Sequence, residues 1–327
     1  MGYESDEKGE IKIMVLNQQK ILVIKHGAFG DIIQGIDAFA SLRVAYPKAQ
    51  IDLLTTRAFS RFFNNCPWFD NILIDPRAPA WRLDSHYKMR QIFISDWDKV
   101  IDLQCSQRTR RYHDWFFKEK NYDGSAKRKW FGDAKDCSHP IPDFTGVNNR
   151  DRMLHTVFMA EATLKKGALD WLLAQSNFAL PAKNYCILIP GCSAAKPSKR
   201  WPADKFIELA KYALQDGILP LLIGTSVDAE AIGAVAKAVP KAVNLMGKTS
   251  FADLAKLAAS SDFTVGNDTG PVFLAARCGK PTIMVMGRDT DPTMSAPVGD
   301  KAAYIQDDII ADVQPKTVFA KFKSLER

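Results

Sequence analysis

The stretch Val265–Pro271 reads Val-Gly-Asn-Asp-Thr-Gly-Pro and joins a short apolar run, Phe263–Val265, to a segment of helical character at 270–278. A turn from a parallel strand into a helix leaves backbone N–H groups and the positive end of the helix dipole at the carboxyl edge of the sheet. Glycine permits close approach of a ligand there, and Pro271 suits the first helical turn. The stretch predicts a parallel α/β sheet with a diphosphate-binding corner, and the alternative is an ordinary capped turn.

Short β-rich apolar runs alternate with helical segments on both sides of this turn, which indicates βαβ units and mostly parallel sheets. Residues 108–149 lack such periodicity, so we expect a long functional loop region with one or two short helices there. We expect an N-terminal extension at 1–19, an α/β domain at 20–165, a linker at 166–184 and a second α/β domain at 185–327. The expected strands are 20–25, 51–55, 71–74, 99–103, 185–189, 219–223, 243–245, 263–265 and 281–286.

Composition narrows the class of protein and of partner. The net charge is +7, and residues 108–129 hold eight basic against three acidic side chains, which suggests an anionic partner, with a solvated basic face as the equal alternative. No apolar run is long enough for a transmembrane helix, and the six cysteines form no C-x-x-C pair, so we expect a reducing cytoplasm. The five histidines show no metal-ligand spacing, so no metal site is predicted.

A second motif, Pro190–Pro202, also follows an expected strand and precedes a helix. Its small residues could wrap a ligand, while Lys196, Lys199 and Arg200 could neutralise phosphate. In a transferase, such charges stabilise the departing nucleoside diphosphate. The alternative is a solvated basic loop.

A third motif, Gly27–Asp31, lacks the complete G-x-G-x-x-G pattern of dinucleotide-binding folds. Its glycine turn could still bring Asp31 to the top of the first sheet, where a carboxylate can remove a proton from an attacking hydroxyl. The alternative is that Asp31 caps a helix. An Asp-x-Asp match at Asp289–Asp291 allows a further sugar or phosphate contact.

These three motifs, in this order, resemble the ADP-heptose:lipopolysaccharide heptosyltransferases of glycosyltransferase family 9. The resemblance runs along nearly the whole chain from Lys20 and includes Trp97–Gln104, Lys199–Pro202, Leu274–Ala276 and Gly279–Pro281. It implies a GT-B fold, with two Rossmann-like domains whose parallel sheets face each other across a cleft. The first domain would bind the acceptor and the second the nucleotide-sugar donor.

The activity that the resemblance implies is an inverting transfer of heptose from ADP-heptose, as co-substrate, to a lipid A-linked inner-core acceptor. No metal or other cofactor is implied, and nucleic acid is not expected as a partner. The implied location is the cytoplasm, with peripheral contact at the inner membrane.

The resemblance also implies roles for single residues. Asp31 would be the catalytic base, and either Asp228 or Glu230 would hold the ribose, with the register between them open. The implied donor-binding residues are Ser193, Lys196, Lys199, Gly224, Asp228, Glu230, Asn267, Asp268, Thr269, Gly270 and Pro271. The implied acceptor-binding residues are Lys25, Arg57, Arg61, Gln104, Arg108, Arg110 and Arg111.

Some positions depart from the family pattern. Asp37 stands where relatives usually carry proline in the first helix, and Arg288 replaces another frequent proline. Three alternatives therefore stay open: a transferase using a UDP- or GDP-sugar, a nucleotide-cofactor oxidoreductase, and a non-catalytic glycan- or lipid-binding module.

Overall fold

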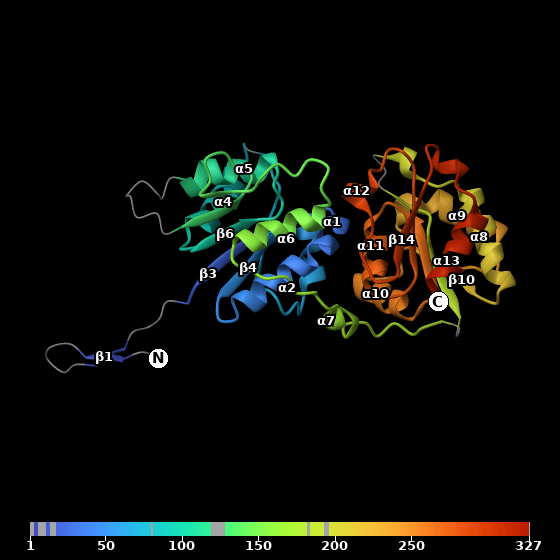
Figure 1. Cartoon of the computed structure of the whole chain (residues 1–327), viewed down its shortest axis with the longest axis horizontal. Coiled ribbons are helices and arrows are strands. Elements are labelled where there is room, and N and C mark those ends of the chain that lie inside the picture. The colour runs from blue at the N-terminus through green and yellow to red at the C-terminus, as the bar shows by residue number, and fades with distance from the viewer. Residues whose placement is uncertain are drawn as a thin grey trace.

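The computed structural model describes residues 3–5, 11–13, 18–79, 81–118, 128–181, 184–192 and 196–326. The chain forms two α/β halves, which we call the first half (18–165) and the second half (184–326), and they stand side by side in Figure 1. The predicted boundaries between domains and linker remain a proposal. Among the described residues, no helix combines the length and apolar character needed to cross a membrane.

The first half is built on a six-stranded parallel sheet of order β5-β4-β3-β6-β7-β8. Its strands are β3 (Lys20–Ile24), β4 (Gln50–Thr56), β5 (Asn71–Asp75), β6 (Lys99–Asp102), β7 (Lys129–Gly132) and β8 (His139–Pro140). Its helices are α1 (Phe29–Gln34), α2 (Ile36–Ala45), α3 (Arg57–Ser60), α4 (Leu83–Ile94), α5 (Gln107–Tyr112) and α6 (Asn149–Met159). Successive side chains of a strand point to opposite faces of the sheet. In β3, Ile21 and Val23 therefore pack on one side of the sheet, and Leu22 and Ile24 on the other.

The second half repeats this plan in the order β11-β10-β9-β12-β13-β14. Its strands are β9 (Tyr185–Ile189), β10 (Leu219–Leu222), β11 (Val243–Asn244), β12 (Phe263–Asn267), β13 (Thr282–Met286) and β14 (Ala302–Gln306). Its helices are α8 (Ala203–Gln215), α9 (Ala229–Ala238), α10 (Phe251–Ser260), α11 (Gly270–Arg277), α12 (Pro292–Ser295) and α13 (Pro315–Glu326). A small antiparallel pair, β1 (Tyr3–Ser5) and β2 (Ile11–Ile13), precedes both halves.

The two parallel sheets confirm the predicted fold class, and every strand expected from the sequence is present. The prediction of a loop region at 108–149 was wrong in part, because β7 and β8 extend the first sheet within it. Trp130 and Phe131 are buried in β7, but the basic run before them breaks the apolar pattern by which strands are recognised.

Sheet order places the functional loops. In both sheets the strand order reverses between the first and fourth strands, at β3/β6 and at β9/β12. Ligands of open α/β sheets bind at the carboxyl ends of the strands beside such a switch point. The three sequence motifs follow β3, β9 and β12, so each leaves its sheet at a switch point.

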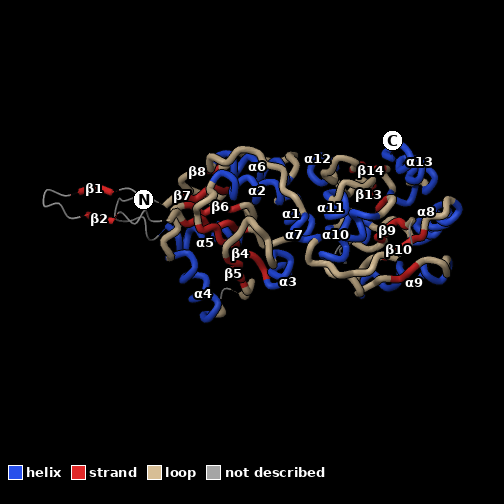
Figure 2. The backbone as a smooth tube through the Cα atoms, turned by 90° about the horizontal axis from the view of Figure 1, so that it is seen from below, coloured by secondary structure: helices blue, strands red, loops and turns tan. Residues whose placement is uncertain are grey.

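The halves meet through α1 and α11, which face each other in Figure 1, and through α7 (Asp170–Leu173), which packs on α10 (Figure 2). Phe29 of α1 stacks on Phe251 of α10 with ring centroids 4.2 Å apart. A Cβ on Gly270 would lie 2.6 Å from Phe29, so only glycine allows this close approach. One apolar cluster therefore continues from the first half into the second.

Candidate active site

A cavity of about 580 Å³ lies between the halves and brings the third motif opposite the first and second. From the first half it is lined by Ala28–Asp31, Gln34, Phe144, Val147, Asn149 and Arg152. From the second half it is lined by Lys196, Lys199, Asp268–Pro271, Phe273, Met294 and Ser295. The predicted base and six of the predicted donor residues thus share one cavity.

The donor side centres on the start of α11. Thr269 is the N-cap residue, and its side chain makes no capping hydrogen bond. Pro271 has no N–H and the Val272 N–H donates to the Thr269 carbonyl at 3.0 Å, so the Gly270 N–H is the amide of this first turn that has no acceptor among the described residues. Asp268 is not the N-cap residue of the helix. Its carboxylate instead pairs with Lys199 at 2.5 Å and accepts a hydrogen bond from the Thr290 hydroxyl at 3.2 Å. This corner offers amide donors and lysines to an anion.

Asp31 lies on the first turn of α1, half-buried at the opposite wall. Its Oδ2 accepts a hydrogen bond from the Ala28 N–H at 3.1 Å, and its Oδ1 accepts one from the Asn149 Nδ2 at 2.8 Å. The contact with Ala28 shows that Asp31 supports the start of the helix, as the alternative reading holds, yet the carboxylate still lines the cavity. Asp31 can therefore support the start of the helix and still present its carboxylate to a ligand in the cavity.

Lys25 precedes the same turn and is only 1 % exposed. Its Nζ donates to the Leu103 carbonyl at 3.4 Å. Burial lowers the pKa of this lysine to about 8, against the opposing effect of the Asp31 carboxylate. The structure places Lys25 beneath the site, where it makes no surface for an acceptor.

Asn267 is fully buried at the end of β12. Its Nδ2 donates to the carbonyls of Pro190 and Gly191 at 2.7 and 3.2 Å, and its Oδ1 accepts from the Trp201 N–H at 2.9 Å. These bonds use the amide to hold the ends of the second motif, so Asn267 shapes the donor loop from below. Ser193, in the middle of that loop, lies outside the described residues.

Asp228 and Glu230 do not line the cavity, but they differ in their distance from the donor loop. Asp228 is buried and accepts from the Thr225 N–H at 2.9 Å, while its Oδ1 has no hydrogen-bond partner among the described residues and lies 3.8 Å from the Arg200 Nη2. A Cβ on Gly191 would lie 2.2 Å from that oxygen, so Asp228 sits directly under the loop. A Cβ on Gly224 would likewise lie 3.0 Å from its Oδ2, whereas Glu230 is exposed on α9.

The predicted acceptor arginines separate into three places. Arg110 pairs with Asp133 at 2.6 Å and lines a second cavity of about 470 Å³. Arg108 and Arg111 line a third cavity of about 220 Å³ on the other side of α5. Arg57 and Arg61 are exposed on and after α3, and neither is among the residues that line these cavities.

The second cavity adjoins the first, because Phe144 and Arg152 line both. Gln104 also lines it, and its Oε1 accepts from the His26 and Gly27 N–H groups at 2.9 and 3.3 Å. Gln104 therefore ties the loop after β6 to the turn that carries Asp31.

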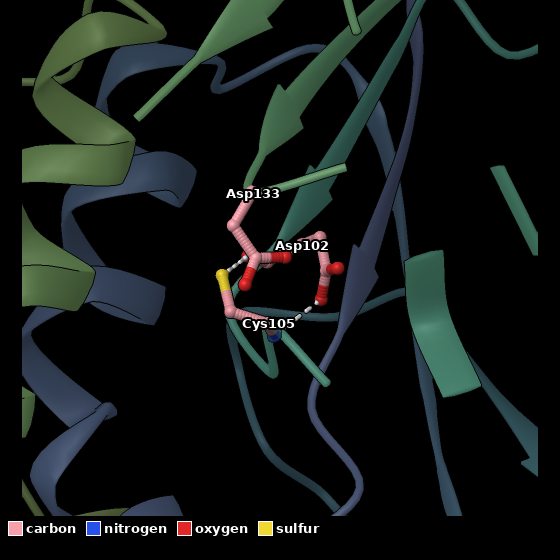
Figure 3. A group of neighbouring side chains, drawn as sticks. All are labelled: Asp102, Cys105 and Asp133. Carbon is pink, nitrogen blue, oxygen red and sulfur yellow. Dashed lines mark hydrogen bonds between the residues drawn. The ribbon is translucent and has the colours of Figure 1, made fainter. Parts of the chain in front are cut away.

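Three potential metal ligands, Asp102, Cys105 and Asp133, lie together beneath the second cavity (Figure 3), with their ligand atoms within 4.8 Å of one another. Burial raises the pKa of Asp102 to about 6, and burial also raises the pKa of the Cys105 thiol. The Asp102 Oδ1 accepts from the Gln104 and Cys105 N–H groups, and Asp133 is neutralised by Arg110. These bonds give the cluster a role in closing the loop after β6.

Sequence reasoning missed Asn149, Arg152 and the importance of Asp37. Asp37 is 1 % exposed and accepts hydrogen bonds from Arg277 at 2.5 Å, Arg150 at 2.8 Å and the Gly167 N–H at 2.9 Å. Burial acts to raise the pKa of Asp37, but the hydrogen bonds from Arg277 and Gly167 outweigh it and the pKa is lowered. The sequence signal for Asp37 was that it stands where relatives usually carry proline. In the structure Asp37 forms an ion pair with Arg277 of the other half.

Comparison with known proteins gives concordant matches. The chain is 26 % identical over 315 residues to lipooligosaccharide heptosyltransferase 2 of Haemophilus ducreyi, and the match covers 88 % of each chain. A family 9 glycosyltransferase of Veillonella parvula superposes with a TM-score of 0.79 at 18 % identity, covering 96 % of this chain and 98 % of that one. An E. coli heptosyltransferase solved with ADP superposes with a TM-score of 0.74 at 17 % identity, covering 94 % and 100 %.

These structural matches confirm the predicted GT-B fold, and the family match removes the alternative of a nucleotide-cofactor oxidoreductase. The model of glycosyltransferase family 9 (heptosyltransferase) matches residues 155–319, just over half of the chain, and includes the whole donor corner. The chain is therefore a glycosyltransferase and belongs to glycosyltransferase family 9.

Proposed function

We propose that this protein transfers heptose from ADP-heptose to a lipid A-linked inner-core glycan with inversion at the anomeric carbon. The observation that carries the proposal is the single cavity in which Asp31 faces Lys196, Lys199 and the start of α11. The Haemophilus ducreyi relative is a lipooligosaccharide heptosyltransferase, and 88 % of its length is covered by the match. The similar E. coli heptosyltransferase was solved with ADP.

The reaction is a direct displacement. The diphosphate binds at the α11 N-terminus, where amide donors and the helix dipole favour negative charge. Lys199 exchanges its bond to Asp268 for the phosphate and, with Lys196, offsets the charge that builds on departing ADP. Asp31 removes the proton from the acceptor hydroxyl as that oxygen attacks the anomeric carbon.

Within the donor site, we assign the ribose contact to Asp228 rather than Glu230. Asp228 lies under the Gly191 backbone and keeps one carboxylate oxygen without a hydrogen-bond partner in the segments that the structure describes, whereas Glu230 points to solvent. Asp228→Asn should weaken ADP binding several-fold, and Glu230→Gln, its matched control, should leave the affinity unchanged.

The acceptor enters through the second cavity, which Arg110 and Gln104 line and which joins the first at Arg152. Both cavities open beside cationic side chains, which suits the phosphates and acidic sugars of an inner-core acceptor. Arg110→Ala should raise the KM for the acceptor, with the KM for the donor unchanged.

We further propose that the first half rests on the cytoplasmic face of the inner membrane. Trp81, just before α4, is 74 % exposed, and Leu83 and Tyr87 of α4 are 79 % and 64 % exposed. Trp115 is 40 % exposed near Arg111. Exposed Trp and Tyr accompanied by arginine suit the interface of an anionic bilayer, and α4 lies at the outer edge of the first half (Figure 2). Sedimentation with anionic vesicles should fall in a W81S/Y87S variant, and binding equal to that of wild type would contradict this placement.

The deciding experiment measures ADP release and product mass with ADP-heptose and a lipid A-linked inner-core acceptor. Transfer to that acceptor, with the opposite anomeric configuration in the product, supports the proposal. Thermal stabilisation by UDP or GDP but not by ADP would instead identify a transferase with another donor. Donor binding without any transfer would favour a non-catalytic binding module.

A further inference from the structure

We propose that Asn149 and Arg152 position the Asp31 carboxylate for proton transfer, as a relay anchored on the backbone of the loop after β6. The inference rests on the proposed function, since it assigns Asp31 as the base. Neither residue belongs to the three sequence motifs, and both come from α6, 118 residues or more along the chain from Asp31.

The relay consists of consecutive hydrogen bonds. Arg152 Nη2 donates to the Leu103 carbonyl at 2.8 Å and to the Asn149 Oδ1 at 2.8 Å, and its Nε donates to the same oxygen at 3.3 Å. Asn149 Nδ2 then donates to the Asp31 Oδ1 at 2.8 Å. The Leu103 carbonyl also accepts from Lys25, so the anchor itself is held by a second buried cation.

This arrangement determines the orientation of the Asn149 amide. A guanidinium has only donors, so the Asn149 atom that faces Arg152 must be the oxygen. The amide nitrogen must then face Asp31 and can only donate. A donor on this carboxylate favours its ionised form, which is the form that accepts a proton.

The relay also leaves Asp31 with room to act. Each of its oxygens receives a single hydrogen bond within the described part of the chain, from Ala28 or from Asn149. A carboxylate offers about four lone-pair positions, so unused ones remain on the cavity side. An arginine bonded directly to Asp31 would occupy two of them and lower its basicity. Interposing Asn149 keeps the guanidinium charge one residue away.

The charged groups around Asp31 come from three sides. Lys25, directly after β3, lies below it and Arg152 of α6 beside it, while Lys196, Lys199 and Asp268 line the opposite wall. The pH test therefore needs variants that change only the relay and leave these groups in place.

The test is the pH profile of kcat/KM. Asn149→Leu removes the donor, so its acidic limb should move up by about one pH unit, with kcat lowered about tenfold and ADP affinity unchanged. Asn149→Asp places a second carboxylate beside Asp31, so its limb should move up by roughly one to three units. Arg152→Met should lower kcat, and Arg152→Lys should recover part of the loss.

Arg150→Met is the matched control, because Arg150 lies on the same helix but bonds to Asp37. It should lower the thermal midpoint without moving the acidic limb. An unmoved limb in both Asn149 variants would overturn the inference, as would an equal shift in Arg150→Met. If the wild type transferred no heptose, the proposed function would fail, but the inference could still be judged from the ¹³C titration of the Asp31 carboxyl, assigned with Asp31→Asn.

Discussion

Two aspartates six residues apart, Asp31 and Asp37, have opposite surroundings. Asp31 lies in the first turn of α1, lines the cavity and, within the described segments, accepts hydrogen bonds from two uncharged donors, Ala28 and Asn149. Asp37 begins α2, is buried and bonds directly to two arginines, one of them from the other half of the molecule. The comparison teaches that a carboxylate can be held in place by amides and stay available for chemistry, whereas guanidinium partners bind it for structure.

The largest effect is expected from removing the Asp31 carboxylate, which we propose as the base. Asp31→Asn keeps the shape of the side chain but cannot take the proton, so kcat should fall by about 10²–10⁴-fold. The Kd for ADP, measured by calorimetry, should stay within twofold, because the donor corner is built by the second half. Turnover close to that of wild type would show that another group is the base.

The matching change at the second aspartate should affect stability. Asp37→Ala leaves the buried guanidinium of Arg277 without its carboxylate, which should lower the free energy of unfolding by about 3–5 kcal/mol. Urea denaturation measures this loss. A D37A/R277M double variant removes both charges and should be less destabilised than D37A. Equal losses would mean that the ion pair is not the source.

Lys25, buried below Asp31, should make the free energy of unfolding depend on pH in the alkaline range. Because burial lowers its pKa from 10.5 to about 8, the unfolded chain binds more protons than the folded protein between those values. Its contribution therefore makes stability rise with pH across that window, by at most about 1.4 kcal/mol per pH unit. The difference in unfolding free energy between wild type and Lys25→Met should show this slope between pH 8 and 10. A flat difference would mean that the ammonium is better solvated than its burial indicates.

Asp37 should show its pH dependence on the acidic side. Its lowered pKa means that its stabilising contribution is complete above the ordinary value of 3.8 and is lost as the pH falls towards the folded-state value. Acid unfolding of wild type and Asp37→Asn should therefore converge below about pH 4. Curves that remain parallel through this range would contradict the assignment.

The fold could be predicted from sequence because its strands are apolar on both faces and its turns carry glycine. Those signals are local, and they located β3, β9 and β12 together with the loops that follow them. β7, β8 and β14 were missed, because β7 follows a basic run, β8 has two residues and β14 is a partly exposed strand at the edge of its sheet.

The site could be predicted only where it follows such a strand. The sequence indicates Asp31, Lys199 and residues 268–271 because each follows a predicted strand. Asn149 and Arg152 come near Asp31 only through the packing of α6 on α1. Nothing in a single sequence links segments that are so distant. Lys25 and Asn267 were expected to contact a ligand because of their side-chain chemistry. In the structure both are buried and form hydrogen bonds to backbone carbonyls of the protein instead.

The stacked rings of Phe29 and Phe251 have a mechanical consequence. They join the halves on the floor of the interface, beside Gly270, while the lysines and Asn149 stand on the walls above. A rotation that preserves the ring contact exposes little apolar surface, so it is the least costly relative movement of the halves. The aromatic pair would be the pivot of any such rotation, and the Asp37–Arg277 ion pair is a second contact across the halves that the rotation must keep or break.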